Sequence, residues 1–279
     1  MAWAAATLCL AAAAAFWATL PNVRPLAKSF PKTTAFMERR RLELSRSGQN
    51  ARLEWTPVPL ERISPWLRRA VIVAEDARFY QHGGVDWNAV REAAGKNWDR
   101  GRIRIGASTI TQQLAKNLYL SPSRTPWRKF RELVITRRLE STLSKARILE
   151  LYLNVVEFGP RTYGAEAASR RYFGKPAAVL SPHEAATLAA VIPSPRLYDP
   201  VRHPERVERR ARRILRLMQA PEETPPADSP TRPRAVAFPD ATPLPATPSE
   251  PTPEPEPVGA SPASPGSSAI LASNESMGR

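Results

Sequence analysis

The sequence predicts a mainly α-helical protein with an N-terminal transmembrane helix and a disordered C-terminal tail. Residues 1–20 carry no charged side chain, helix-capping patterns dominate between residues 57 and 218, and half of the 30 prolines follow residue 220. Alternation of apolar and polar side chains is rare; Arg102–Ile105 is the best case and could form a short ribbon. We therefore divide the chain into a transmembrane helix (1–20), a juxtamembrane stalk (21–56), a folded domain (57–218) and a proline-rich tail (219–279).

The first 20 residues are mostly alanine, with leucine, phenylalanine and tryptophan, and they are long enough to cross a bilayer as a helix ending before Pro21. Alanine inserts only marginally, so a cleaved signal peptide is the alternative, although no basic residue precedes the apolar run. Arg24 and Lys28 follow the run. The positive-inside rule alone would place the domain in the cytoplasm, but the N-terminal flank is too short to decide. Cys9 is the only cysteine, so no intramolecular disulfide is expected.

Capping signals indicate where the helices of the folded domain begin. Thr109 followed by Gln112 fits a capping box that opens a helix to Tyr119. Further predicted helices begin at Thr125-Pro126 and end near Leu143, begin at Ser144 and continue through Leu153, and begin at Ser181-Pro182, with Glu184 at the third helical position, and end at Val191.

Charge separates the tail from the rest of the chain. The residues after 220 include three Lys/Arg and eight Asp/Glu, a net charge of −5, so the +15 of the whole chain implies +20 on residues 1–220. The tail is too polar and too rich in proline to bury a core, so we expect it to be disordered. The positive charge of residues 1–220 favours an anionic partner: nucleic acid, anionic lipid or a phosphate-bearing substrate.

Glu75 and Asp76 are candidate site residues because they follow an apolar run and precede Phe79, His82 and a diglycine. A helix through this segment would place Glu75, Phe79 and His82 on one face, at i, i+4 and i+7. An acid held against an aromatic ring is partly desolvated, which raises its pKa and prepares it to accept a proton near neutral pH. The alternative is an ordinary Asp/Glu pair on a solvated surface.

A second candidate cluster combines a polar helix stripe with several cations. The helix that follows Gly106 offers backbone donors at its N-terminus, which attract phosphate or sugar oxygens. Ser108, Gln112 and Lys116 repeat every four residues and form one stripe. Each feature has an ordinary alternative, a solvated helix face for the stripe and a surface ion pair for Arg128 with Glu132. The functional interpretation is a diphosphate site with a second carboxylate, comprising Lys116, Arg124, Arg128, Lys129 and Glu132.

Taken together, the motifs resemble those of the peptidoglycan glycosyltransferases, glycosyltransferase family 51. The resemblance covers roughly residues 57–215 and rests on the joint order of motifs, since each alone is weak. The motifs are Glu75-Asp76-x-x-Phe79-x-x-His82-x-Gly84, Gly106-x-Ser108-Thr109-Ile110-x-Gln112-Gln113, Arg128-Lys129-x-x-Glu132 and Ile148-Leu149-x-x-Tyr152-Leu153-Asn154, followed by Gly159, Tyr163-Gly164 and Tyr172-Phe173.

The resemblance implies a lysozyme-like, largely helical domain that polymerises lipid II on a growing glycan strand. Glu75 is then the catalytic base and Glu132 assists at the donor site, while Asp76, Phe79 and His82 support Glu75. No cofactor is required, although a divalent cation, Mg²⁺ or Mn²⁺, can help the diphosphate to leave; no metal-ligand cluster demands one. Substrate-binding positions are Lys116, Arg124, Arg128, Lys129, Ser108, Gln112, Gln113 and Asn117.

The same resemblance implies a single-pass protein of the bacterial inner membrane with its catalytic domain on the periplasmic side. Its partners are the membrane, the substrates and other cell-wall synthesis or division proteins, and not nucleic acid. Trp87 and Trp98 lie among basic residues, which suits a membrane interface as well as it suits two core tryptophans.

The chain departs from the larger family members in two respects. An S-x-x-K sequence occurs at Ser29–Lys32, but its partner motifs are missing and the tail is too short for a transpeptidase domain. The proline-rich tail is itself atypical, and we interpret it as a spacer or partner-binding segment. Two rival functions remain at this stage: a lysozyme-like glycan hydrolase, which also needs a buried Glu, and a membrane-tethered module that binds nucleic acid or lipid.

Overall fold

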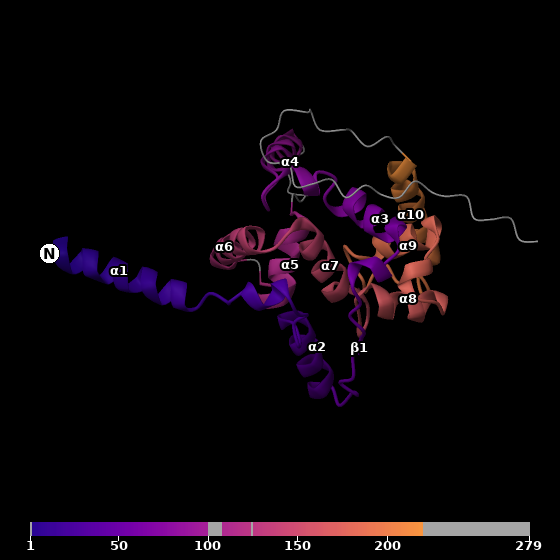
Figure 1. Cartoon of the computed structure of the whole chain (residues 1–279), viewed down its shortest axis with the longest axis horizontal. Helices are drawn as coiled ribbons and strands as arrows, with labels where there is room; N and C mark the ends of the chain where they lie inside the picture. The colour runs from indigo at the N-terminus through magenta and orange to yellow at the C-terminus, as the bar shows by residue number, and fades with distance from the viewer. Residues whose placement is uncertain (1, 100–107, 124, 220–279) are drawn as a thin grey trace, which may run out of the picture. The chain divides into compact units, whose positions relative to one another are not determined.

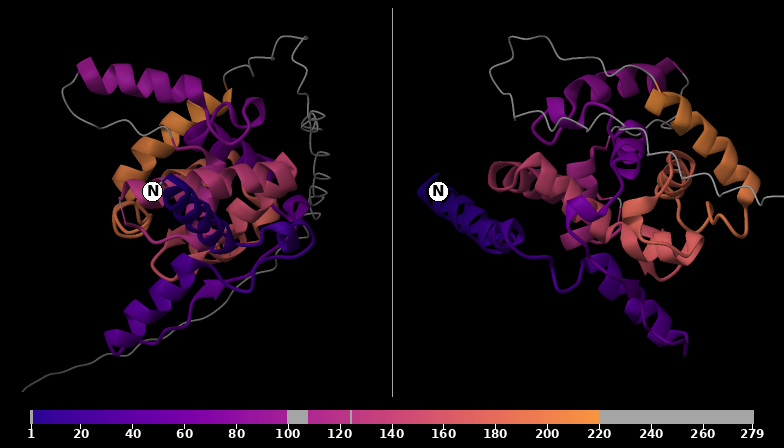
Figure 2. Two further views of the ribbon diagram at one scale, coloured as in Figure 1. Left: turned by 90° about the vertical axis from the view of Figure 1, so that its left-hand side faces the viewer. Right: turned by 45° about the vertical axis from the view of Figure 1, so that its right-hand side comes forward.

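The computed structural model describes residues 2–99, 108–123 and 125–219 and is mainly helical, as predicted (Figure 1, Figure 2). Three predicted features lie outside the described residues: the ribbon at Arg102–Ile105, the cation of Arg124 and the tail beyond Gln219. The elements are α1 (Ala2–Ala18), η1 (Arg24–Ala27), α2 (Ala35–Arg46), β1 (Glu54–Trp55), η2 (Leu60–Arg62), α3 (Pro65–Glu75), η3 (Phe79–Gln81), α4 (Trp87–Asp99), α5 (Ile110–Tyr119), α6 (Pro126–Thr142), α7 (Lys145–Val155), β2 (Glu157–Gly159), β3 (Thr162–Tyr163), α8 (Ala165–Phe173), η4 (Ala177–Val179), α9 (Pro182–Val191) and α10 (Pro204–Gln219).

The four helix starts predicted from capping signals are confirmed. Thr109 and Gln112 form a capping box at the start of α5, in which the Thr109 side chain accepts from the Gln112 amide. Ser181 and Glu184 form a second box at α9. Thr125 and Ser144 cap α6 and α7 with their side-chain oxygens. Each such cap satisfies an otherwise unpaired N–H and is worth about 1 kcal/mol.

Two groups of packed helices form the core. α5 packs against α6 and α7, while α9 packs against α3 and α10 (Figure 1). Leu114 of α5, Ile135 of α6 and Tyr152 of α7 are fully buried, and burying one such side chain stabilises the fold by about 1.5–3 kcal/mol. Because α3 and α5 both belong to this core, the side chains at their ends are held in fixed positions.

A small three-stranded sheet, in the order β1-β3-β2, joins the N-terminal segment to the domain. Asn154, at the end of α7, holds this junction, since its side chain exchanges two hydrogen bonds with the Val58 backbone at 2.8 Å. Gly164 lies beside Asn154 at φ +81°, and a Cβ there would approach the Asn154 carbonyl oxygen to 2.6 Å. Both residues therefore serve the fold.

The N-terminal segment differs from the expectation. Residues 2–18 form α1, which ends two residues before Leu20. Among the residues that the structure describes, no helix is long and apolar enough to cross a membrane. The transmembrane helix predicted for residues 1–20 is therefore not shown.

The prediction of one continuous helix with Glu75, Phe79 and His82 on the same face is wrong. α3 ends at Glu75, because Asp76 leaves the helical region at φ −162° and ψ 71°. The chain resumes only as the short 3₁₀ helix η3, which contains Phe79 but not His82. Hydrogen bonds from distant residues hold the Asp76 side chain at this break, and periodicity in the sequence carries no sign of them.

Candidate active site

Glu75 is the last residue of α3, and its side chain points into the domain. Ser64 caps the helix and Pro65 begins it, which directs the apolar face of α3 into the core and leaves Glu75 only 10 % exposed. Its Oε2 atom accepts a hydrogen bond from Nε2 of Gln113 on α5 at 2.9 Å, and its Oε1 atom lies 3.4 Å from a guanidinium nitrogen of Arg210 on α10. Three helices far apart in the sequence therefore meet at this carboxylate.

Burial raises the pKa of Glu75 above its usual range. The hydrogen bond from Gln113 and the charges of Arg210 and Lys116 lower that pKa, and neighbouring Asp76 raises it, but desolvation is the largest influence. A carboxylate in this state accepts a proton more readily than an exposed one, as general-base catalysis requires.

Gln113 is fixed from behind by a buried tyrosine. The Tyr152 hydroxyl donates to the Gln113 side-chain oxygen at 2.9 Å, so the Gln113 NH₂ group must face Glu75. Tyr152 itself is fully buried on α7. Gln113, which the sequence places among substrate-binding positions, therefore also holds the candidate base.

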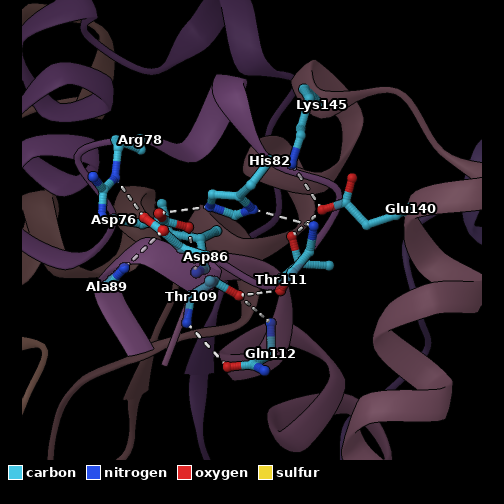
Figure 3. A network of polar contacts seen from close by, with 12 residues as sticks. Asp76, Arg78, His82, Asp86, Ala89, Thr109, Thr111, Gln112, Glu140 and Lys145 are labelled. Carbon is cyan, nitrogen blue, oxygen red and sulfur yellow. Dashed lines mark hydrogen bonds and ion pairs between the residues drawn. The ribbon is translucent and has the colours of Figure 1, made fainter. Parts of the chain in front are cut away.

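Asp76 and His82 tie the end of α3 to the start of α5 (Figure 3). One carboxylate oxygen of Asp76 accepts from the Ile110 amide at 3.0 Å, and the other bonds to Nε2 of His82 at 2.8 Å. The Gly84 amide donates to Nδ1 of His82, so the proton of a neutral His82 is on Nε2 and points at Asp76. Asp76 is 7 % exposed, and its bonds hold Glu75 in place relative to α5.

The loop that contains His82 also approaches α6 closely. Gly84 has φ +93°, and a Cβ there would lie 2.7 Å from the Thr136 side chain. The Thr109 hydroxyl donates to the Gly84 carbonyl at 2.7 Å. Phe79 is fully buried, and its ring packs edge-on against Tyr80 and lies beneath the Lys145 ammonium. The contacts found for Phe79 thus place it in the core that supports the loop.

The described residues contain one group with the side chains of a metal site: Asp76, His82 and Asp86, whose ligand atoms lie within 4.8 Å of one another (Figure 3). These atoms already have partners. Asp86 accepts from Arg78 at 2.7 Å and from the Ala89 amide at 2.9 Å, and Nδ1 of His82 accepts from Gly84. Because the Arg78 guanidinium already contacts Asp86, the three side chains are better suited to holding the loop in place than to binding a cation.

Next to Glu75, a polar cavity of about 80 Å³ brings together most of the predicted substrate-binding residues. Glu132 is 3 % exposed and contacts both the Arg128 guanidinium and the Lys129 ammonium. Burial lowers the pKa of Lys116, while the charges of Glu132 and Glu75 raise it. The lining residues are Ser108, Gln112, Gln113, Lys116, Arg128, Lys129 and Glu132.

Ser108, Gln112 and Lys116 line this cavity together, but Ser108 precedes the N-cap of α5, so only Gln112 and Lys116 lie on the helix and the predicted three-residue stripe is wrong for Ser108. Gln112 has a second role, because its side-chain oxygen accepts from the Thr109 amide in the capping box. Asn117 is 8 % exposed on α5 but is not part of the cavity lining. A divalent cation fits the lining poorly, since its single carboxylate is already in contact with two cations.

Comparison with known proteins identifies the family. A sequence model of the transglycosylase family matches residues 42–219, more than half of the chain. The chain belongs to the transglycosylase family. The family resemblance inferred from the motifs is therefore confirmed.

Individual relatives of this transglycosylase support the assignment. A protein of Laribacter hongkongensis named biosynthetic peptidoglycan transglycosylase is 48 % identical over 188 residues, which cover 67 % of this chain and 82 % of the relative. A protein of Thiobacillus denitrificans with the same name is 52 % identical over 188 residues, covering 67 % and 81 %. A third of that name, from an Azoarcus species, is 53 % identical over 169 residues, covering 61 % and 73 %.

Two residues of the transglycosylase site were not predicted as site residues. Arg210 lies on α10, 135 positions after Glu75, and only the tertiary fold brings the two together. Tyr152 was noted as a motif residue, yet nothing local indicated that its hydroxyl would orient Gln113. The one available signal was a tyrosine among the mostly aliphatic buried residues of α7.

Proposed function

We propose that this protein is a peptidoglycan glycosyltransferase that polymerises lipid II into β-1,4-linked glycan strands and has no transpeptidase activity. One observation carries the proposal: a buried carboxylate with a raised pKa, Glu75, lies beside a cavity lined by the cations of Lys116, Arg128 and Lys129. A base next to an anion-binding pocket matches a sugar transfer whose leaving group is a diphosphate. The family and the names of the relatives agree with it.

Glu75 acts as the base in a single displacement. Its carboxylate takes the proton from the 4-hydroxyl of the acceptor sugar as that oxygen attacks C1 of the growing strand. The new C1–O4 bond forms while the bond from C1 to the diphosphate oxygen breaks, and the electron pair leaves with undecaprenyl diphosphate. Attack opposite an α-linked leaving group gives the inverted, β-linked product. Gln113 keeps Oε2 of Glu75 in place during this step.

The cations promote the departure of the diphosphate. Negative charge builds up on the leaving oxygen as the C1–O bond breaks, and fixed positive groups in a partly dry cavity stabilise that charge. Lys116, Arg128 and Lys129 are available there, and Glu132 holds the last two together. These side chains neutralise the leaving group without a cofactor, so we propose that Mg²⁺ or Mn²⁺ assists at most by binding the diphosphate itself.

Incubation of the purified full chain with labelled lipid II tests the function. We expect long glycan strands to form, and pre-formed glycan strands added to the same protein to keep their length. Shortening of the pre-formed strands, without new polymer from lipid II, would show a hydrolase in place of a glycosyltransferase. A parallel reaction with EDTA tests the cofactor proposal, because the strands should still form.

We also propose that the protein works at the bacterial inner membrane with its catalytic domain on the periplasmic side. The N-terminal segment is apolar, and the aromatic side chains Trp3, Trp17, Trp87 and Trp127 are between 56 % and 88 % exposed. Exposed tryptophans next to basic residues suit the boundary between lipid and water. The high exposure of Trp87 argues against a core role; the side chain of Trp98 lies outside the described residues.

Protease accessibility tests the proposed location. In spheroplasts of a bacterial host, added protease should digest the catalytic domain while the protein sediments with membranes. Recovery of the intact domain from the soluble fraction would contradict the proposal. Other cell-wall synthesis or division proteins are expected partners in the same compartment, and co-purification from detergent extracts would identify them.

A further inference from the structure

A second, larger cavity of about 340 Å³ lies between α2, the β2–β3 sheet and the turn at residues 193–196. Its volume is within the range of pockets that bind small organic ligands. We call it the arginine cavity, because its lining includes the charged side chains of Arg39, Arg40, Glu43, Glu157 and Arg196, together with Phe36, Tyr163 and Ser194.

The charges of the arginine cavity are unbalanced. Glu43 alone contacts all three arginines: Arg39 at 2.8 Å, Arg40 at 3.3 Å and Arg196 at 3.5 Å. Glu157 is the second carboxylate, and its nearest cation, Arg196, is 3.8 Å away, too far for a hydrogen bond. Three guanidiniums therefore face two carboxylates, which leaves one positive charge for a ligand to compensate.

Two of the residues that line the cavity also carry polar atoms that lack partners. Among the described residues, Oε1 of Glu157 and Nε of Arg40 are buried and have no hydrogen-bond partner. Burial raises the pKa of Glu157, which reports the same loss of solvent. A buried acceptor and a buried donor left unpaired each cost free energy that a suitable ligand would recover. A ligand that pairs with both kinds of group would carry a carboxylate for the arginines and an N–H group for Glu157.

The arginine cavity adjoins the polar cavity beside Glu75. Phe36 lines the former, Lys116 lines the latter, and the Lys116 ammonium lies 5.8 Å from the centre of the Phe36 ring. A ligand anchored at Lys116 by its diphosphate can therefore extend past Phe36 without leaving the protein surface. In the substrate of the proposed reaction, the part that carries both carboxylates and N–H groups is the peptide.

We propose that the arginine cavity binds the peptide arm of lipid II, holding a peptide carboxylate with Arg39, Arg40 and Arg196 and a peptide N–H with Glu157. The inference rests on the proposed function and adds a substrate subsite to it. A phosphate group alone fits less well, because it would satisfy the arginines but offer no donor to Glu157 at neutral pH.

Kinetics on two substrates test the subsite. Wild-type protein and an Arg196→Ala variant are compared on lipid II with the full peptide and on lipid II trimmed to its first amino acid. Charge-assisted hydrogen bonds of this kind predict a 10- to 100-fold higher KM for wild-type protein on the trimmed substrate, with little change in kcat. For Arg196→Ala, KM on the full substrate should rise to the value that wild-type protein shows on the trimmed substrate, and KM on the trimmed substrate should not rise further. Arg196 is more than half exposed, so we expect the variant to fold, and Arg39→Ala is the equivalent second variant.

Each outcome decides the question. Equal KM values for wild-type protein on the two substrates would overturn the subsite. So would variants whose KM rises by the same factor over wild-type protein on both substrates. Either result would leave the glycosyltransferase function intact. Failure to polymerise either substrate overturns the proposed function itself. Free peptide should compete with full-length lipid II in wild-type protein and not in Arg196→Ala. Equal competition by inorganic phosphate would show a general anion site and overturn the assignment to the peptide.

Discussion

Glu75 and Glu132 are both buried carboxylates near one substrate cleft, but their surroundings differ. Glu75 accepts a short hydrogen bond from the neutral amide of Gln113 at 2.9 Å and a longer one from the cation Arg210 at 3.4 Å. Glu132 is in direct contact with Arg128 and Lys129. Burial therefore raises the pKa of Glu75, as a base requires, whereas Glu132 fixes the position of two cations. In the proposed mechanism, the same residue type therefore accepts a proton in one place and holds positive charge in position in the other.

The largest expected effect follows from removing the proton acceptor. Glu75→Gln keeps the shape of the side chain but cannot take a proton, so we expect kcat for lipid II polymerisation to fall by roughly 10²–10⁴-fold. Glu132→Gln should lower kcat by less, because the cations of Arg128 and Lys129 remain beside the leaving group. Polymerisation rates of labelled lipid II measure both. If the two variants lose equal activity, the division of roles between the carboxylates is wrong.

Removal of a cation tests the other end of the cleft. Lys116→Met keeps most of the side-chain length and removes the charge that would stabilise the leaving diphosphate, so we expect kcat to fall by about 10²-fold. Lys28→Met is the control, since Lys28 is exposed and lies outside the lining of the polar cavity. An effect of Lys116→Met on KM alone would mean that the cation binds substrate without stabilising the transition state.

The two carboxylates also differ in how far the sequence predicts them. Helix geometry is local, so the spacing of Gln112 and Lys116 correctly predicts one face of α5 and hence part of the wall of the polar cavity, whereas Ser108 lines that cavity from just before the helix. The pair of Arg128 with Glu132 follows in the same way from i, i+4 spacing on α6. The cation end of the cleft was therefore largely predictable.

The surroundings of Glu75 were not predictable in the same way. Asp76 breaks the helix through bonds to Ile110 and His82, residues that only the fold brings together. Tyr152 and Arg210 reach the site across the core from other helices. The sequence could indicate that an acid is desolvated after an apolar run, but not which groups would limit the rise of its pKa.

Gln113 provides a test of that balance. Its N–H stabilises the charged form of Glu75, so Gln113→Leu should raise the pKa of Glu75 further. Because the base must be deprotonated, activity lost on acidification should then be lost at a higher pH, and the acid limb of the kcat/KM profile should move to higher pH. We expect kcat/KM of Gln113→Leu to fall by about tenfold below neutral pH and by less above it. A Tyr152→Phe variant, which only loosens Gln113, should shift the limb less; identical limbs in all three proteins would exclude this hydrogen bond as a determinant.

Arg210 should give the smallest effect, because its side chain is one-third exposed and its 3.4 Å contact is partly screened by water. Its charge lowers the pKa of Glu75, so Arg210→Ala should move the acid limb in the same direction as Gln113→Leu, with a loss of only a few-fold at neutral pH. The two contributions differ in physical origin, and salt separates them: added salt should move the wild-type limb toward that of Arg210→Ala but leave the shift caused by Gln113→Leu in place. Arg212→Ala, which removes an exposed arginine paired with Glu208 on the same helix, is the control. A salt-independent shift in Arg210→Ala would mean that Arg210 acts through packing of α10 against α3. The difference between Glu75 and Glu132 would then depend on burial and on the Gln113 hydrogen bond alone.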